Sequence, residues 1–397
     1  MINKKMLGLG QNRSAIRDLF EYGRKRKEEI GAESVFDFSL GNPDLPAPEC
    51  VNNSIIELVN NTDSKSLHGY TSAIGDLQTR AAIARNLEER YDVSLDESLI
   101  YLTVGAAASL VSALSAVTNP GDEVIVLAPY FPEYKVFIER TGAVVREVKC
   151  CEGTLLPDIQ AISNVINEKT AAVIINTPNN PTGAVYGEKC ISAIAKMLSE
   201  KERELGHAIY VISDEPYREL VYDGVTVPFI PSYYKNTVIC YSFSKALSIP
   251  GERIGYCLVN PSADSAREVY DAIAGSARSF GYVCAPSLMQ KIIPSCLECK
   301  LDFTNYDRNR TLLYKTLTEY GFDVVKPEGA FYIFIKSPCG SAKKFCEMAK
   351  KKEILIVPSD SFGYEGYARL AYCVSFDTVK TSLPAFYELA KELGLTK

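Results

Sequence analysis

The stretch Ala172-Val173-Ile174-Ile175, which runs into Asn176-Thr177-Pro178-Asn179-Asn180-Pro181-Thr182-Gly183, decides the fold class of this chain. Its apolar residues do not alternate with polar ones, which indicates a strand that is buried on both faces. Such strands are typical of a parallel sheet covered by helices. The polar turn that follows at once then lies at the carboxyl end of the strand, where open α/β sheets bind ligands.

Four further apolar runs are each followed directly by a polar or glycine-rich turn. They span residues 99–104, 124–128, 209–212 and 237–241, and helical stretches such as 187–205 separate them. The pattern predicts an α/β fold: a three-layer sandwich whose mainly parallel sheet lies between helices. We therefore expect all five turns to meet at one edge of the sheet, although the sequence separates them widely.

The pattern changes after about residue 295. Strands are expected at 330–335, 354–357 and 367–373, and helices at 306–320, 341–351 and 384–393. This order suits a smaller α+β domain. We accordingly predict an N-terminal segment at 1–48 that packs on the small domain or on a partner subunit, a large cofactor domain at 49–295 and a small C-terminal domain at 296–397.

Composition excludes several classes of function. The 397-residue chain has a net charge of −6 and 47% hydrophobic residues, which is ordinary for a globular protein and offers no basic surface for nucleic acid or an anionic membrane. Its apolar runs are far shorter than a membrane span, and the N-terminus lacks a signal-type apolar stretch. We expect a cytoplasmic protein with no membrane or nucleic-acid partner.

Cysteine and histidine usage narrows the chemistry. Twelve cysteines without a signal peptide predict a reducing compartment and free thiols. Cys296 and Cys299 form one CxxC without a second pair, so two buried helical thiols are expected there, with a zinc or redox role as the alternatives. Because the chain has only two histidines, no histidine-rich metal site and no Ser-His-Asp triad is expected, and we predict no metal.

The segment Ser242-Phe243-Ser244-Lys245, followed by Pro250-Gly251-Glu252-Arg253, points to a specific cofactor. A lysine that attacks a carbonyl must be unprotonated, which burial or a nearby cation achieves. An arginine supplies that charge and also binds phosphate through two parallel hydrogen bonds. A cofactor with an aldehyde and a phosphate is pyridoxal phosphate. The alternative, a solvated pair of surface cations, loses weight because Lys245 falls at a predicted strand end.

Taken together, the motifs resemble those of the fold-type I pyridoxal-phosphate enzymes, specifically the class I aminotransferases of the aspartate aminotransferase group. The resemblance covers nearly the whole chain in order. It is carried by Leu40-Gly41-Asn42-Pro43-Asp44, Gly69-Tyr70-Thr71, Gly105, Asn180-Pro181-Thr182-Gly183, Asp214-Glu215-Pro216-Tyr217, the lysine segment, Pro327-Glu328-Gly329-Ala330-Phe331-Tyr332 and Arg369.

The resemblance implies the catalytic residues. Lys245 corresponds to the lysine that forms a Schiff base with the cofactor and later moves a proton. Asp214 corresponds to the carboxylate that pairs with the protonated pyridine nitrogen, and Tyr217 and Asn180 to the residues that bind the 3′-oxygen. In isolation Asp214 could equally cap a helix, Tyr217 could be a core tyrosine and Asn180 a turn residue.

The resemblance also implies a phosphate site and a shared active site. Gly105, Ala106 and Ala107 would offer backbone N–H groups at a helix N-terminus, and Ser242, Ser244 and Arg253 would complete the cradle. Tyr70 corresponds to a tyrosine that reaches the phosphate from the neighbouring subunit of a homodimer, although it could instead pack in a turn. Phe131 would stack on the cofactor ring, with Tyr130 as the alternative.

For the substrate, the resemblance assigns Arg369 and Gly41 to the α-carboxylate, with Phe131 and Asn180 beside them. The expected activity is a ping-pong transfer of an amino group from an L-amino acid, aspartate first, to a 2-oxo acid such as 2-oxoglutarate. Alanine and aromatic donors remain open, and Arg278 is a candidate for a distal carboxylate by location only. A carbon–sulfur β-lyase on the same fold is the alternative enzyme; a regulator domain is disfavoured because no DNA-binding module fits ahead of residue 35.

Overall fold

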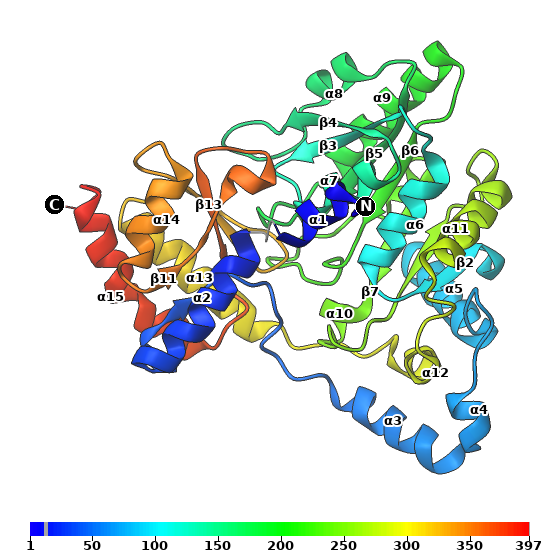
Figure 1. Ribbon diagram of the computed structural model, residues 1–397, viewed down its shortest axis with the longest axis horizontal. Helices are drawn as coiled ribbons and strands as arrows, with labels where there is room; N and C mark the ends of the chain where they lie inside the picture. The colour runs from blue at the N-terminus through cyan, green and yellow to red at the C-terminus, as the bar shows by residue number, and fades with distance from the viewer. Residues whose placement is uncertain (12–14, 397) are drawn as a thin grey trace.

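The computed structural model describes residues 1–11 and 15–396, which form one large sheet and two small ones (Figure 1). The large sheet has seven strands in the order β2-β8-β7-β6-β5-β3-β4, and β8 alone runs antiparallel to its neighbours. Its strands are β2 (Ile100–Thr103), β3 (Glu123–Ala128), β4 (Val144–Lys149), β5 (Thr170–Asn176), β6 (Tyr210–Asp214), β7 (Thr237–Ser242) and β8 (Gly255–Val259). All five predicted strands are present, and β4 and β8 are additional.

Helices cover both faces of the large sheet. Along β3, Val124 and Val126 pack in one cluster with residues of α6, α7 and α11, whereas Ile125 and Leu127 pack on the opposite face with residues of α8 and α9. The helices are α5 (Leu77–Tyr91), α6 (Ala106–Val117), α7 (Glu133–Arg140), α8 (Ile159–Val165), α9 (Glu188–Leu205), α10 (Phe243–Ala246), α11 (Ala266–Phe280) and α12 (Ser287–Cys296). The predicted three-layer α/β architecture is confirmed. No helix among the described residues is long and apolar enough to cross a membrane.

The smaller sheets lie to the left in Figure 1. One has the antiparallel order β12-β13-β10-β9, and the other pairs β1 with β11 in parallel. Their strands are β1 (Phe36–Asp37), β9 (Val324–Val325), β10 (Tyr332–Lys336), β11 (Ile354–Leu355), β12 (Val357–Pro358) and β13 (Tyr367–Ala371), and their helices α13 (Thr304–Glu319), α14 (Ala342–Lys350) and α15 (Phe376–Glu392). The single strand expected at 354–357 is thus divided between two sheets.

The closing helix also differs from its prediction. It starts at Phe376 rather than Pro384, because the side chain of Ser375 accepts a hydrogen bond from the N–H of Thr378 and caps the first turn. Pro384 lies inside the helix. A proline usually marks a first turn, which is why the sequence pattern placed the start too late.

The N-terminal segment forms α1 (Lys4–Gln11) and α2 (Ala15–Ile30), which contact different parts of the molecule. Lys5 of α1 donates a hydrogen bond of 2.9 Å to the carbonyl oxygen of Glu139 in α7, whereas α2 packs on the smaller sheets. A Cβ at Gly23 of α2 would lie 2.8 Å from the side chain of Leu355, and Arg26 pairs with Glu353 at 2.6 Å. Beyond β1 the chain crosses to α3 (Glu49–Asn61) and α4 (Ser64–His68), which flank the large sheet. The chain returns to the smaller sheets between α12 and α13.

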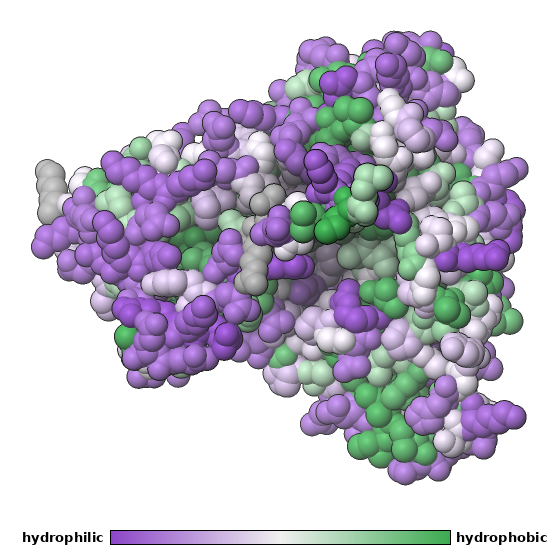
Figure 2. All heavy atoms as spheres, in the orientation of Figure 1, coloured by the Kyte–Doolittle hydropathy of each residue, from purple (hydrophilic) through white to green (hydrophobic). Residues whose placement is uncertain are grey.

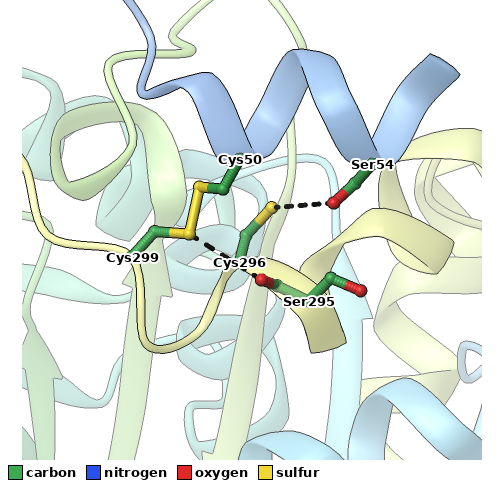
Figure 3. The surroundings of a disulfide bond; sticks show 5 residues. All are labelled: Cys50, Ser54, Ser295, Cys296 and Cys299. Carbon is green, nitrogen blue, oxygen red and sulfur yellow. Dashed lines mark hydrogen bonds between the residues drawn. A yellow bond between two sulfur atoms is a disulfide. The ribbon is translucent and has the colours of Figure 1, made fainter. Parts of the chain in front are cut away.

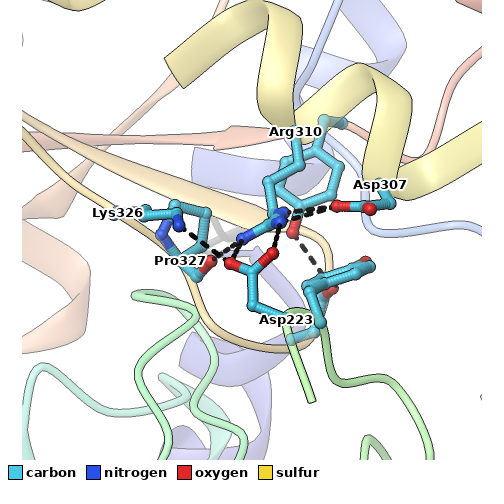
Figure 4. Close-up of polar contacts among 8 residues, drawn as sticks. Asp223, Asp307, Arg310, Lys326 and Pro327 are labelled. Atoms are coloured by element: carbon cyan, nitrogen blue, oxygen red, sulfur yellow. Dashed lines mark hydrogen bonds and ion pairs between the residues drawn. The ribbon is translucent and has the colours of Figure 1, made fainter. Parts of the chain in front are cut away.

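An ion pair between the buried Arg310 and the exposed Asp223 joins the two parts of the molecule (Figure 4). Arg310 of α13 donates to both oxygens of Asp223, at 3.0 and 2.9 Å, and to the carbonyl oxygen of Pro327 at 2.9 Å. Lys326 lies 2.8 Å from the same carboxylate. These two cations hold the pKa of Asp223 well below its usual range, so the pair persists through the neutral range.

The cysteines depart from the expectation that all are free. Cys50, at the start of α3, forms a disulfide with Cys299, 249 residues later (Figure 3). Cys296 ends α12 as a buried free thiol, as predicted, but Cys299 lies beyond the helix and is only partly buried. The prediction was wrong because the spacing of the CxxC carries no information about a third cysteine brought beside it by the fold.

Candidate active site

A cavity of about 290 Å³ lies at the carboxyl ends of the strands of the large sheet, facing the smaller sheet. In Figure 2 the molecule is hollowed between its two parts. The cavity collects most of the predicted site residues: Gly41, Ala106, Ala107, Phe131, Asn180, Asp214, Tyr217, Ser242, Ser244, Lys245, Arg253 and Arg369 all line it. Widely separated turns therefore meet in one place, as the sheet topology requires.

Lys245 lies on α10, one short turn after the end of β7. Its Nζ donates a hydrogen bond of 2.9 Å to the carbonyl oxygen of Gly41. The pKa of this amine is lowered to about 8, chiefly by burial; Cys373 opposes the shift, and the charges of Arg253 and Arg369 contribute to it. A substantial neutral fraction near pH 8 is what a nucleophilic or proton-transferring lysine needs.

Asp214 ends β6 and is fully enclosed. Its Oδ2 accepts a hydrogen bond from the hydroxyl of Tyr134 and a longer one, 3.4 Å, from the amide of Asn176, whereas Oδ1 has no partner. Burial raises the pKa of this carboxyl to about 7, although the Tyr134 hydrogen bond lowers it. A buried carboxylate with an unsatisfied oxygen is costly unless a cationic N–H group fills the gap, and a protonated pyridine nitrogen is such a group.

The predicted phosphate cradle surrounds the N-terminus of α6. Gly105 caps this helix with φ of 95°, in the region that favours glycine, and a Cβ there would collide with the guanidinium of Arg253. Arg253 Nη1 donates to Ser244 Oγ at 3.2 Å, and the hydroxyls of Ser242 and Ser244 lie 2.7 Å apart. A helix N-terminus, a guanidinium and two hydroxyls form an anion site, so the residues present fit the phosphate of pyridoxal phosphate.

Two aromatic side chains and one amide lie between these groups. The hydroxyl of Tyr217 is 2.8 Å from that of Tyr332, and burial raises the pKa of Tyr217 well above its usual value. The backbone N–H of Asn180 donates a hydrogen bond of 2.8 Å to Asn176 Oδ1. Phe131 lines the cavity, while Tyr130 is buried beside Gly363, so Phe131 is the aromatic residue in position to stack.

Arg369 reaches the cavity from β13 of the smaller sheet and is 2% exposed. Nη1 donates to Asn180 Oδ1 at 3.2 Å and Nη2 to the carbonyl oxygen of Ser39 at 2.5 Å, but Nε has no partner. Burial lowers the pKa of this guanidinium, and among the described residues no carboxylate pairs with it. A buried cation without an anion is equipped to bind a substrate carboxylate.

Two predicted residues lie outside the cavity of their own chain. Tyr70 follows α4 and is 90% exposed. Arg278 is exposed on the last turn of α11 and does not line the cavity. Neither residue touches the groups described above within one chain.

The structure adds residues to which the sequence assigned no role. Tyr134 holds Asp214, Tyr332 holds Tyr217, Asn176 bridges Asp214 and Asn180, and Ile16 of α2 closes part of the wall. Tyr134 lies three residues beyond Phe131 on the first turn of α7, so its helical spacing offered a signal. Nothing in the sequence indicated that Ile16, in the N-terminal segment, reaches the cavity.

Comparisons with known proteins agree with this geometry. Residues 33–385 match the family described as aminotransferase class I and II. The chain is 29% identical to aromatic-amino-acid aminotransferase 2 of Thermococcus litoralis, over 97% of each chain, and 31% identical to an aspartate/prephenate aminotransferase of Thermus thermophilus, over 90% of each. Its structure is similar to that of an aminotransferase from Eubacterium rectale, with a TM-score of 0.97, 49% identity and 99% of each chain covered. It is also similar to the aspartate aminotransferase of Thermus thermophilus with maleate, with a TM-score of 0.86, 26% identity and coverage of 98% and 99%.

Proposed function

This chain belongs to the class I and II aminotransferases, which depend on pyridoxal phosphate, and from that premise we propose that it transfers the amino group of an L-amino acid to a 2-oxo acid in a ping-pong cycle at the cavity around Lys245. The observation that carries the proposal is a set of charged groups that have no oppositely charged partner among the described residues, two of them with an unsatisfied polar atom. Asp214 Oδ1, Arg369 Nε and the amine of Lys245 converge on one space, each at a place where the cofactor or the substrate would complete it.

Each residue has a distinct task in this proposal. Arg369 binds the α-carboxylate of the substrate, and Arg253, Ser242, Ser244 and the α6 N-terminus hold the phosphate. Asp214 and the hydroxyl of Tyr217 would hold the cofactor ring, and Phe131 would pack against it. When bound, pyridoxal phosphate supplies an electron-withdrawing ring that stabilises negative charge at the substrate Cα.

Lys245 moves the proton. As a neutral amine it removes a proton from the substrate Cα, and as an ammonium it returns one during the second half of the cycle. The carbonyl oxygen of Gly41, which accepts from Nζ at 2.9 Å, orients the amine between these roles. Ile16 and Leu40 present apolar surface to the same cavity.

Lys245→Ala tests this assignment. Turnover should be lost, while the fold and the Asp223–Arg310 ion pair remain. Circular dichroism and kcat are measured on the same preparation, so that loss of activity can be separated from loss of folding. Lys326→Ala, which removes an exposed lysine beside Asp223, is the matched control. A fully active Lys245→Ala enzyme would sink the mechanism.

The sequence resemblance favours aspartate as donor with 2-oxoglutarate as acceptor. A second candidate, an aromatic or other apolar donor, is favoured by the cavity wall. Among the described residues, the cations that line the cavity are Lys245, Arg253 and Arg369, and each has another task. The rest of the wall is largely apolar, with Leu40 and Leu110 beside Phe131 and Ile16.

A half-reaction screen decides between the two donors. The holoenzyme is mixed with single amino acids, and the absorption of the bound cofactor is followed in time. Aspartate and glutamate should convert it fastest if the dicarboxylate assignment holds, and phenylalanine and tyrosine if the apolar wall decides. Release of pyruvate from cystathionine would instead identify a β-lyase.

The active unit in this proposal is a homodimer in which Tyr70 reaches the phosphate of the neighbouring site. What supports it is exposure: Tyr70 projects from the protein surface, and Ile56 and Val59 of α3 are 59% and 53% exposed. Figure 2 shows an apolar patch at the bottom of the molecule, where Figure 1 places α3. Sedimentation should give a dimer, and Tyr70→Phe should weaken cofactor retention. A monomer with full activity would refute this part.

A further inference from the structure

One disulfide joins two passages of the chain, each of which runs between the two parts of the molecule. Cys50 ends the first passage, residues 38–50, which leads from β1 of the smaller sheets to α3. Cys299 lies in the second passage, residues 297–303, which leads from α12 to α13. Their bond therefore ties together two segments that would both have to bend if the smaller part moved against the larger one.

The first passage also touches the catalytic lysine. The carbonyl oxygen of Gly41 accepts a hydrogen bond from Lys245 Nζ, and that of Leu45 accepts one from Ser248, three residues beyond the lysine. The hydroxyl of Tyr306, at the start of α13, accepts hydrogen bonds from the N–H groups of Asp44 and Leu45. A constraint on Cys50 and Cys299 thus acts on a segment in direct contact with the active site.

The disulfide borders a second cavity through Cys299. Cys50 and Cys299 are only partly buried, and this cavity has a volume of about 580 Å³. Phe243, Ala246 and Leu247, around the helix that carries Lys245, line the same cavity. Cys296 contributes a third sulfur, within 4.8 Å of the other two, whose thiol lies 4.0 Å from the hydroxyl of Ser54 (Figure 3).

We propose that the Cys50–Cys299 bond is a reversible redox switch that clamps the two passages and slows transamination when it is closed. Opening consumes two thiol molecules: the S–S bond breaks, each protein sulfur gains a hydrogen, and the two reagent thiols become one disulfide. A low-molecular-weight disulfide closes the bond by the reverse exchange. Loop and domain movements limit turnover in many enzymes. A bond that restrains the two passages can therefore slow turnover by slowing such a movement.

The test compares two forms of the holoenzyme. One is treated with oxidised glutathione and the other with dithiothreitol, and the reagents are then removed. Thiol titration of the denatured protein should give 10 free cysteines in the closed form and 12 in the open form. The closed form should turn over about fivefold more slowly than the open form. This factor is the low end of couplings between separate sites. Hydrogen exchange at residues 40–48 should be faster in the open form.

Variants assign the effect to this bond. Cys50→Ser and Cys299→Ser should each show the open-form rate under both treatments. Cys151→Ser, which removes an exposed free thiol, is the matched control and should respond as the wild type does. Equal rates for the two titrated forms of the wild type would overturn the proposal. So would tight binding of one zinc ion per chain by the reduced protein that blocks reoxidation, because the three thiols would then be a metal site.

Discussion

Asp214 and Glu215 are neighbours at the end of β6, yet the fold treats their carboxylates in opposite ways. Glu215 accepts hydrogen bonds from Ser213 at 2.6 Å and from Arg218 Nε at 2.5 Å, and both members of that ion pair are 3% exposed. Asp214 has neutral donors on one oxygen and none on the other. The paired carboxylate has its charge balanced within the chain, whereas that of Asp214 has no cationic partner among the described residues, as our proposal for this site requires.

The largest expected effect comes from removing the carboxylate of Asp214, which lacks a cationic partner. Asp214→Ala should lower kcat by about 10²–10³-fold, as expected for the loss of a group placed to stabilise developing charge. The apoprotein should be at least as stable as the wild type, because an unsatisfied buried carboxylate has been removed. Steady-state rates and urea unfolding of the apoprotein measure the two quantities. A marked loss of apoprotein stability would contradict the contrast with Glu215.

Breaking the ion pair of Glu215 with Arg218 should have the opposite effect: stability should fall while the rate changes little. Arg218→Met leaves Glu215 buried without its cation and should lower the free energy of unfolding by about 3–5 kcal/mol. Because Arg218 does not line the active-site cavity, the rate of the half-reaction per folded molecule should change little. The double variant Glu215→Gln with Arg218→Met should recover part of the stability, and a failure to recover it would show that the charge of Glu215 is not the cause.

The same contrast predicts a pH dependence of stability. Since burial raises the folded pKa of Asp214 from 3.8 to about 7, the folded apoprotein holds a proton that the unfolded chain has released between these values. Its stability should therefore fall as pH rises from about 4 to 7, with a contribution from Asp214 of about 4 kcal/mol. Asp214→Asn should remove this slope in urea unfolding measured across the range. An unchanged slope would mean that another group titrates there.

The smallest effect is expected at Tyr134. Tyr134→Phe removes a hydrogen bond that lowers the pKa of Asp214, so that pKa should rise further. The loss of one hydrogen bond to a charged group is worth about 1.5–3 kcal/mol, or roughly a tenfold to hundredfold weaker cofactor retention. Dialysis of the holoenzyme measures retention, and the pH profile of kcat should shift upward. Tyr130→Phe, in the same turn but outside the cavity, is the control and should do neither.

Much of the site could be predicted because turns after parallel strands must meet at one edge. Lys245, Asp214 and Asn180 were located by that rule, and they line one cavity with Arg369. The edge strand β4 escaped detection because its exposed, charged residues 144–149 form no apolar run. By contrast, β8 is wholly buried, but its five residues follow the lysine segment closely and were assigned to no strand.

Other features depend on packing that no local pattern encodes. The rotamer of Tyr134 that reaches Asp214 is set by the surrounding core, and the approach of Cys50 to Cys299 depends on the whole topology. The lining by Ile16 depends on where the N-terminal helix docks. Sequence periodicity fixes the edge at which a site forms, whereas the partners of each side chain emerge only from the assembled layers.

The parallel pairing of β1 with β11 has a consequence for synthesis on the ribosome. Phe36 and Asp37 bond to a strand at Ile354–Leu355, so the earliest strand made must wait for one of the last. The large sheet, in contrast, contains residues 100–259 alone and can form while the remainder is still being translated. The nascent α2 helix and the strand after it therefore spend most of translation undocked, and a chain stopped before residue 354 would carry them exposed to proteases and chaperones.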